Sequence, residues 1–179
     1  MRIDKIQIRN FKGFENETFE FKEQFTVFIG ENAKGKTSVL DALAVAVGSF
    51  FLGIEGIPAR TILDKEIRVV TIDGQPKPQK PVAIEANGHI DKKPIHWKRE
   101  ILTQKTTHKD AKEISIIATQ KLNYSRKRSG VLFPVIAYYG TGRLWAEHVF
   151  PIFFINLTWG AVLSGIVSTA GFIITKYFQ

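Results

Sequence analysis

The residues with the clearest chemical meaning lie in one short segment, Gly30-Glu31-Asn32-Ala33-Lys34-Gly35-Lys36-Thr37, which fits the pattern G-x-x-x-x-G-K-[ST]. In such a loop the backbone N–H groups and the N-terminus of the following helix point at phosphate oxygens. Lys36 would bring a positive charge to the β- and γ-phosphates of a nucleotide, and Thr37 a hydroxyl ligand for Mg²⁺. The sequence therefore predicts a nucleotide site, with ATP and Mg²⁺ as the expected ligands.

The segments on either side of this loop favour the prediction over a plain turn before a helix. Residues 25–29 (Phe-Thr-Val-Phe-Ile) predict a short buried strand. Residues 37–51 predict a helix whose apolar face consists of Val39, Leu40, Leu43, Val47 and Phe50. Strand, glycine-rich loop and helix in this order are the context in which the pattern binds phosphate.

The rest of the chain predicts further strands and one more helix. A hairpin is expected at the N-terminus, with strands over 3–11 and 18–21 joined by a turn at 12–14. Beyond the first helix we expect strands at 67–72, 82–86 with Ile90, 95–101 and 131–139, and a helix at 108–127. Asp73-Gly74 and Asn87-Gly88 are expected to form turns, and 76–81 an extended connection. The strands between 67 and 101 should form a small antiparallel meander inserted after the first helix.

Length and composition limit the classes of protein that remain. A chain of 179 residues forms one domain of ordinary size, or a smaller domain with an appendage. The absence of cysteine excludes disulfides and cysteine-based metal sites, and the four histidines lack metal-ligand spacing. The N-terminus has no apolar signal segment, so we expect the protein in the cytoplasm.

The net charge of +8 is concentrated in the middle of the chain. Residues 77–128 contain 13 Lys and Arg against 5 Asp and Glu, while the rest of the chain contains 12 of each. A concentrated excess of this kind favours a surface that contacts DNA or RNA. A solvated surface without a partner is the alternative.

Two stretches of the sequence resemble known ATPases. Asn10-Phe11-Lys12-Gly13-Phe14, the glycine-rich loop and Asp41-Ala42-Leu43 together resemble the N-terminal half of ABC-type ATPase heads of the SMC, RecF and OLD-nuclease kind. The segment 138–145 (Tyr-Tyr-Gly-Thr-Gly-Arg-Leu-Trp) resembles a stretch in AAA-family ATPases of bacterial antiphage systems, such as the Septu and retron-associated ATPases. The resemblance implies an α/β fold, the P-loop NTPase N-terminal lobe of such a head with an antiparallel β-subdomain, over residues 1–147. It also implies a function in DNA repair or phage defence.

The resemblance also implies further site residues and partners. In such heads the Asn-Phe-Lys turn lies beside the nucleotide, which makes Arg9 and Lys12 candidate contacts. Arg143 falls where a loop senses the γ-phosphate, although it would equally serve as the end of a strand. A partner head or a second copy of the chain is expected. The full set of candidate ligands to the nucleotide is Arg9, Lys12, Gly30, Glu31, Asn32, Ala33, Lys34, Gly35, Lys36, Thr37, Ser38 and Arg143, with Thr37 also on the metal.

Several departures from these families qualify the expected activity. Ala33 and Lys34 stand where the families have glycine and a small residue, and Ala33 lacks the freedom of glycine to adopt a positive φ. No Walker B acidic pair is evident: the apolar run 152–155 precedes Asn156, and 69–73 fits a hairpin better. Leu163-Ser164-Gly165 is a poor match to a signature segment. The sequence therefore predicts ATP binding, with hydrolysis dependent on residues supplied by another chain.

The C-terminal region is apolar over an unusual length. Residues 149–175 contain no charged side chain over 27 positions, more than the ~20 residues that cross a bilayer as a helix. We expect a transmembrane helix that anchors a cytoplasmic head to the inner membrane. A buried core helix and an aberrant tail on a truncated head are the alternatives. A membrane-anchored nucleotide-responsive adaptor and an inactive remnant remain open as alternative functions.

Overall fold

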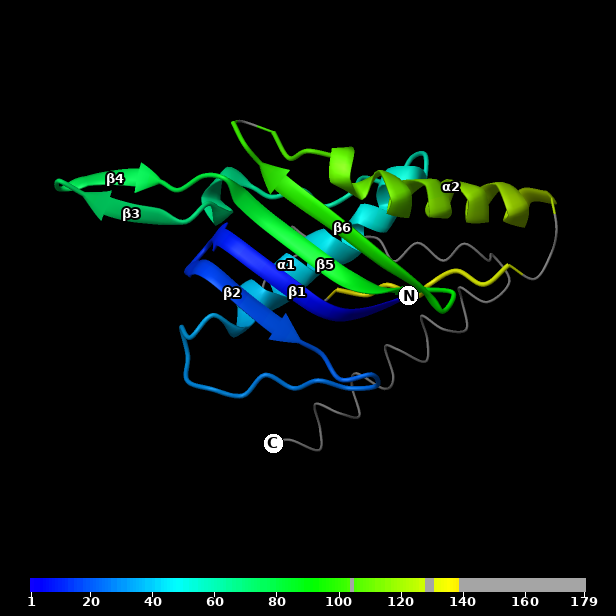
Figure 1. The fold of residues 1–179 in the computed structure, drawn as a ribbon, viewed down its shortest axis with the longest axis horizontal. Coiled ribbons are helices and arrows are strands. Elements are labelled where there is room, and N and C mark those ends of the chain that lie inside the picture. Colours follow the sequence, from blue (N-terminus) through cyan, green and yellow to red (C-terminus); the bar gives the residue numbers. More distant parts are fainter. Residues whose placement is uncertain (104, 128–130, 139–179) are drawn as a thin grey trace, which may run out of the picture. The chain divides into compact units, whose positions relative to one another are not determined.

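The computed structural model describes residues 1–103, 105–127 and 131–138. The chain divides into two compact units, Met1–Val131 and Leu132–Gln179. The first unit contains all the regular structure considered below (Figure 1). Its elements, in chain order, are β1 (Arg2–Phe11), β2 (Phe14–Glu20), α1 (Lys36–Gly48), η1 (Ser49–Gly53), η2 (Asp64–Glu66), β3 (Val69–Ile72), β4 (Gln75–Pro78), β5 (Val82–Ile90), β6 (Lys93–Ile101), η3 (Lys109–Ala111) and α2 (Lys112–Lys127).

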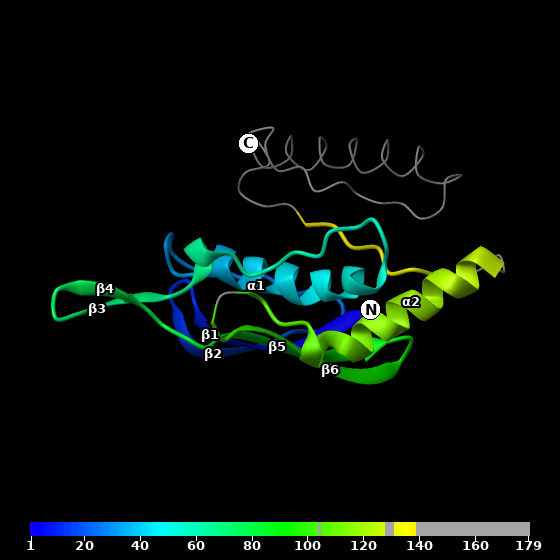
Figure 2. The same ribbon diagram turned by 90° about the horizontal axis from the view of Figure 1, so that it is seen from above.

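Four of the strands form one antiparallel sheet in the order β2-β1-β5-β6. Side chains alternate between the faces of a strand, so the apolar residues of neighbouring strands share one face. Ile8 on β1 pairs with Ile84 on β5, and Ala86 pairs with Trp97 on β6, and all four are buried. α1 crosses this apolar face, and α2 packs beside it against η1 and β6 (Figures 1 and 2). The opposite face of the sheet is polar.

The helix that follows the glycine-rich loop begins and ends close to the predicted positions, but its buried face is only partly the predicted one. Val39 and Phe50 are buried as expected. Leu40 is exposed instead, and the remaining buried apolar positions are Ala42, Val45 and Ala46. Small residues take these positions because the helix lies close against the sheet, where Trp97 donates its indole N–H to the carbonyl of Ala46 (2.9 Å).

β3 and β4 form a separate two-stranded sheet that projects away from the main sheet (Figures 1 and 2). Its turn is Asp73-Gly74, as predicted, and both residues have positive φ (54° and 73°). The expected extended connection at 76–81 is therefore partly a strand. The expectation that 69–73 fits a hairpin better than a Walker B strand is confirmed.

The buried strand predicted at 25–29 is wrong for this structure. The segment has no regular structure, and Phe25, Val27 and Ile29 are exposed. Exposed and half-buried side chains nevertheless alternate along the segment. Phe28 packs edge-on against Phe19 and Phe21, with ring centroids 6.2 Å apart in each pair. An extended segment becomes a strand only when a neighbour pairs with its backbone, and within the described residues no strand pairs with this one.

The predicted turn at Asn87-Gly88 and the inserted meander are also wrong. β5 runs through both residues to Ile90, and the turn to β6 lies at Asp91-Lys92. Gly88 is needed in the strand because a Cβ there would lie 2.1 Å from the carbonyl oxygen of Arg2 on β1. β5 and β6 therefore extend the sheet begun by β1 and β2 and are no insertion.

The helix predicted at 108–127 is confirmed as η3 and α2, but the strand predicted at 131–139 is not found over 131–138. Leu132 and Val135 in that segment are exposed, and Pro134 lacks a backbone donor. Residue 139, Arg143 and the predicted membrane segment 149–175 lie outside the described residues.

In the part of the chain that the structure describes, one helical stretch is long and apolar enough to cross a membrane by length and composition alone. It is α1 continued by η1, residues 36–53, and 44% of it is buried. Core helices of folded domains pass the same test, so this stretch is weak evidence for a membrane span.

Candidate nucleotide-binding site

The glycine-rich loop leads directly into the N-terminus of α1. Gly35 is the N-cap residue of the helix with φ 86°, a left-handed conformation that favours glycine. A Cβ on Gly35 would also lie 2.6 Å from the ring of Phe14 at the start of β2. Ala33 has φ 65°, so it adopts the left-handed conformation that the sequence gave reason to doubt. The loop therefore has glycine at Gly35, where the conformation favours it, and is strained at Ala33, where a residue with a side chain adopts the left-handed conformation.

The ammonium group of Lys36 lies over the loop. It donates hydrogen bonds to the backbone carbonyls of Gly30 and Glu31, both at 2.6 Å. Two neutral carbonyls hold the side chain without neutralising its charge. A phosphate group entering the loop would meet an ammonium that is already in position.

The N-terminal turn of α1 suits an anion. It contains no acidic residue, so no carboxylate competes for the free N–H groups and for the positive end of the helix dipole. Thr37 is exposed and Ser38 is half-buried in this turn. Thr37 can supply one hydroxyl oxygen to Mg²⁺, which prefers oxygen ligands and binds largely through phosphates and water.

The other loop residues are open to solvent. Glu31, Asn32 and Lys34 are exposed, and Lys34 lies 3.8 Å from the carboxylate of Glu31 as an exposed pair. Such pairs contribute little to stability. The loop is therefore accessible, and Lys34 is available to add a second positive charge beside bound phosphate.

Lys12 belongs to a partly buried cluster of four charges. Its ammonium contacts Asp41 of α1 and lies 3.6 Å from Glu66 of η2. Arg60 contacts the same two carboxylates, Glu66 at 2.7 Å and Asp41 at 3.4 Å. The cluster fastens the β1–β2 turn to α1, so the structure places Lys12 on a protein carboxylate one helical turn beyond Thr37.

Arg9 lies elsewhere. It is exposed on β1 and alternates with Ile8, so it is on the polar face of the sheet. α1 and the loop that precedes it are associated with the other face. Of the two side chains that the resemblance adds from β1 and its turn, Lys12 is the nearer to α1.

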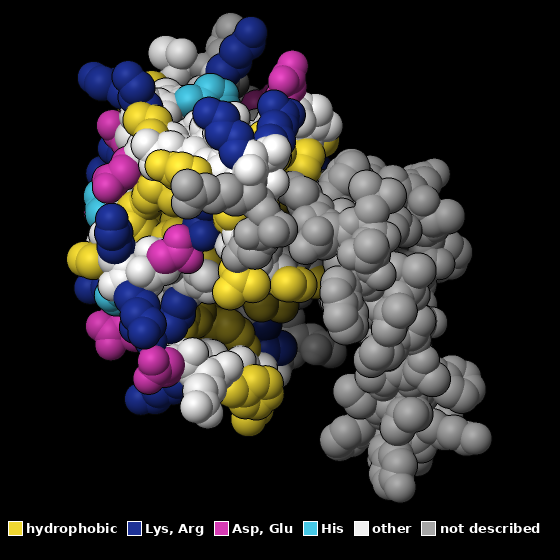
Figure 3. All heavy atoms as spheres, turned by 90° about the vertical axis from the view of Figure 1, so that its right-hand side faces the viewer, with side chains coloured by type: hydrophobic (Ala, Val, Ile, Leu, Met, Phe, Trp, Pro, Cys, Tyr) yellow, Lys and Arg dark blue, Asp and Glu magenta, His cyan; other side chains and the backbone are white. Residues whose placement is uncertain are grey.

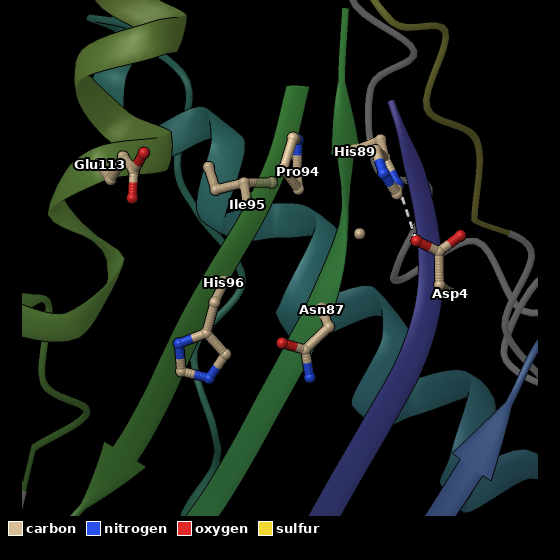
Figure 4. A pocket seen from close by; sticks show the side chains of 8 residues that line it. Asp4, Asn87, His89, Pro94, Ile95, His96 and Glu113 are labelled. Atoms are coloured by element: carbon tan, nitrogen blue, oxygen red, sulfur yellow. Dashed lines mark hydrogen bonds and ion pairs between the residues drawn. The ribbon is translucent and has the colours of Figure 1, made fainter. Parts of the chain in front are cut away.

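A shallow hollow of about 310 Å³ lies away from the glycine-rich loop (Figure 4). Its polar lining includes Asp4, His89, His96 and Glu113, from β1, β5, β6 and α2. His89 and Asp4 are 2.7 Å apart, and Figure 4 shows them pointing toward one another. Two carboxylates in the lining make the hollow unsuited to phosphate.

Within the described residues no cluster of three metal-ligating side chains is found.

The sequence gave no indication of a buried arginine at the far end of α1. Arg99 on β6 is fully buried, and burial lowers its pKa to about 10. Its Nε donates to the carbonyl of Thr107 (3.2 Å), and one terminal nitrogen lies 3.5 Å from the hydroxyl of Ser49, the C-cap of α1. Its hydrogen bonds thus go to uncharged groups, one of them at the C-terminal end of α1, where the helix dipole is negative. Burial, and then the charge of Arg99, lowers the pKa of His108.

Basic side chains are spread over the end of the unit that carries the β5–β6 turn and the far end of α2 (Figure 3). Lys92 and Lys93 lie at that turn, and Arg126 and Lys127 form the last turn of α2. Lys121 joins the two elements through Asp91 at 2.6 Å. Part of the predicted concentration of charge thus lies on one exposed surface, while Arg99, which belongs to the same stretch, is buried.

The glycine-rich loop leads into α1 with a lysine ammonium over it, but the strand that usually precedes such a loop is not found at residues 25–29. The class, a P-loop nucleoside triphosphatase with mixed α and β structure, therefore rests on the sequence pattern and on the family match. The chain belongs to the AAA domain family, whose sequence model matches residues 5–155. The resemblance to the N-terminal part of an ABC-type ATPase head is thereby confirmed.

The curated relatives are proteins of DNA metabolism. The chain is 36% identical over 74 residues to "DNA replication and repair protein RecF" of Acetivibrio thermocellus, a match that covers 41% of this chain and 18% of the relative. It is 46% identical over 43 residues to RecF of Listeria welshimeri and 35% over 43 residues to RecF of Lactococcus lactis. Each of these two matches covers 24% of this chain and 12% of the relative. The chain thus spans less than a fifth of the length of the relatives that it matches.

Proposed function

We propose that the chain is the ATP- and Mg²⁺-binding part of an ATPase that acts in DNA repair or phage defence. The observation that carries the proposal is the position of Lys36. Its ammonium is held over an accessible loop at a helix N-terminus that has no acidic residue. Membership of the AAA domain family and the RecF relatives support an ATPase related to DNA repair, while the phage-defence alternative rests on the resemblance of residues 138–145.

In this proposal the chain's own residues bind and orient the nucleotide. The loop amides of residues 31–38 and Lys36 hold the phosphates, and Thr37 supplies a hydroxyl to Mg²⁺. When bound, Mg²⁺ would supply positive charge beside the phosphates, which favours phosphoryl transfer. Hydrolysis is proposed to need acidic and signature residues from a partner head or a second copy. Arg143 is proposed as a further contact, whereas Arg9 lies on the opposite face of the sheet and Lys12 is held by Asp41.

The decisive experiment measures the affinity of the full chain for a fluorescent ATP analogue. Lys36→Ala should abolish binding because it removes the charge at the phosphates. Lys22→Ala is the control, since it removes an exposed lysine outside the loop. Unchanged affinity in Lys36→Ala would contradict the assignment of the site. A phosphate-release assay on the chain alone then tests whether hydrolysis needs a partner.

We also propose that the basic surface at the β5–β6 turn and the end of α2 contacts a nucleic acid. Lys and Arg side chains that neutralise phosphates make affinity fall as salt rises. Charge reversal of Lys92 and Lys93 should weaken DNA binding and flatten its dependence on salt. Lys22→Glu, an exposed lysine outside this surface, should change neither. A loss equal in both variants would show a non-specific effect of net charge.

The apolar run 149–175 supports a proposed association with the inner membrane, which would make the chain a membrane-anchored adaptor. Carbonate extraction of cell membranes tests it. A chain that is released completely into the supernatant would contradict a membrane-spanning helix.

A further inference from the structure

The β3–β4 hairpin is an exposed arm whose two free edges differ. Its residues 69, 71–78 and 80 are all exposed, and Val69 and Ile72 expose 54% and 41% of their surface. The arm takes no part in the nucleotide site. Its exposed apolar side chains and open backbone are features that proteins ordinarily cover or protect.

The turn fixes which backbone groups face outward. Asp73 and Gly74 both have positive φ, which defines a two-residue turn of type I′, and Ile72 pairs with Gln75 next to it. In such a hairpin the pair beside the turn is hydrogen-bonded, and hydrogen-bonded and non-hydrogen-bonded pairs then alternate. Val70 and Lys77 therefore bond to each other, as do Arg68 and Gln79, where the N–H of Gln79 donates to the carbonyl of Arg68 at 2.7 Å.

The remaining pairs, Val69 with Pro78 and Thr71 with Pro76, direct their backbone groups away from the hairpin. On β4 both outward positions are proline, which has no N–H to donate. That edge is closed to another strand. On β3 the outward positions are Val69 and Thr71, which keep both donor and acceptor, and among the described residues no strand pairs with this open edge.

We propose that the open edge of β3 pairs with β3 of a second copy of the chain in an antiparallel, two-fold symmetric contact. The symmetry follows from the register: with Val70 opposite Val70 of the second copy, each Val69 faces Thr71, and about four hydrogen bonds form. The residues at this edge are uncharged, so like charges do not oppose one another. Because the edge of β4 is closed by proline, the contact ends at two copies instead of growing into a filament.

The chain contains no cysteine, which makes cross-linking a direct test. Val70→Cys places two cysteines opposite each other in a non-hydrogen-bonded pair, where Cα atoms are about 4.5 Å apart and a disulfide can form. Mild oxidation of the full chain without nucleotide should yield a covalent dimer. Lys77→Cys, on the strand opposite Val70 in the same hairpin, is the matched control and should form no covalent dimer. Absence of the dimer in Val70→Cys, or equal dimer in both variants, would overturn the proposal.

Sedimentation measurements over a range of concentrations give a second test without nucleotide. Thr71→Pro removes one outward N–H from each copy, and so two of the four hydrogen bonds between copies, while the bonds within the hairpin stay in place. The dissociation constant of the dimer should rise at least about tenfold. Replacement of both Pro76 and Pro78 by threonine opens the second edge and should produce species larger than a dimer. If Thr71→Pro leaves the association unchanged, or if hairpin variants lose only DNA affinity, the contact is not between copies of β3.

Discussion

The ammonium group of Lys12 pairs with the carboxylate of Asp41, so the turn after the first strand is tied to the helix that follows the phosphate-binding loop. Glu66 and Arg60 complete the cluster from the segment that precedes the projecting hairpin. Three segments distant in sequence thus meet in one group of balanced charges. Its members are partly or largely buried, so removal of one charge leaves another without compensation.

Lys12→Gln and Asp41→Asn should therefore each lower the free energy of unfolding, and their effects should not add. For two residues in one ion-pair network we expect a coupling of about 1 kcal/mol. Chemical denaturation of both single variants and of the double variant measures it. Additive effects would show that Lys12 and Asp41 stabilise the fold independently, which would leave Lys12 free for a nucleotide.

Ala33→Gly should stabilise the protein. The left-handed conformation of Ala33 costs roughly 1–2 kcal/mol, and glycine adopts it without that penalty. The added flexibility of glycine in the unfolded chain offsets part of the gain, so the net effect should be about 1 kcal/mol or less. Ala44→Gly is the control, because Ala44 lies within α1 and the same change there should destabilise by roughly 0.5–1 kcal/mol. Thermal unfolding of both variants decides the sign.

Gly53→Ala should destabilise the protein strongly. A Cβ there would lie 2.0 Å from the carbonyl oxygen of Ser115, so η1 and α2 would have to move apart. Gly53 also accepts a hydrogen bond from Thr119 (2.9 Å), which the movement would break. Gly13→Ala, where nothing lies within 4 Å of the added atom, should be near neutral. Equal melting temperatures for the two variants would contradict the close approach of η1 and α2.

His108 should make stability depend on pH. Burial, followed by the charge of Arg99, lowers its pKa below the ordinary 6.5, so the unfolded chain binds this proton more readily than the folded chain. The contribution is complete above pH 6.5 and is lost as the pH falls through the lowered pKa. His108→Gln should flatten the decline in melting temperature over that range and change little at pH 8.

Arg99→Met gives an independent check on the same histidine. Removal of the neighbouring charge should raise the pKa of His108 toward its ordinary value, as measured by NMR titration of the imidazole. The variant remains informative even if it is less stable, because the titration is read in the folded state. A pKa of His108 that does not rise would assign the whole perturbation to burial.

The sequence predicted the loop, the helices and most strands because these depend on local pattern. The glycines of the loop, the period of α2 and the Asp73-Gly74 turn each leave a signal within a few residues. The errors come from contacts that the pattern does not contain. The pair Asn87-Gly88 predicts a turn, whereas glycine is needed at position 88 because the backbone of Arg2, in another strand, approaches it closely.

The same limit applies to the site. Lys36, Gly35 and Thr37 follow from spacing alone, whereas the cluster around Lys12 joins residues up to 54 positions apart. The alternation of Phe25 to Ile29 predicts a buried strand, which is wrong, because alternation cannot show whether a pairing partner is present. The burial of Arg99 does not follow from the sequence, because a charged residue in a strand is usually exposed. Arg99 is buried because α1 and η3 cover β6.

Asn10 holds both ends of the projecting hairpin. Its carbonyl accepts the N–H of Arg68, which precedes β3, and its side-chain amide donates to the carbonyl of Pro81, which follows β4, both at 2.9 Å. The chain therefore leaves the sheet and returns to it at one residue. A segment attached in this way can change its length and sequence, or be exchanged for another, while β1 and β5 keep their register.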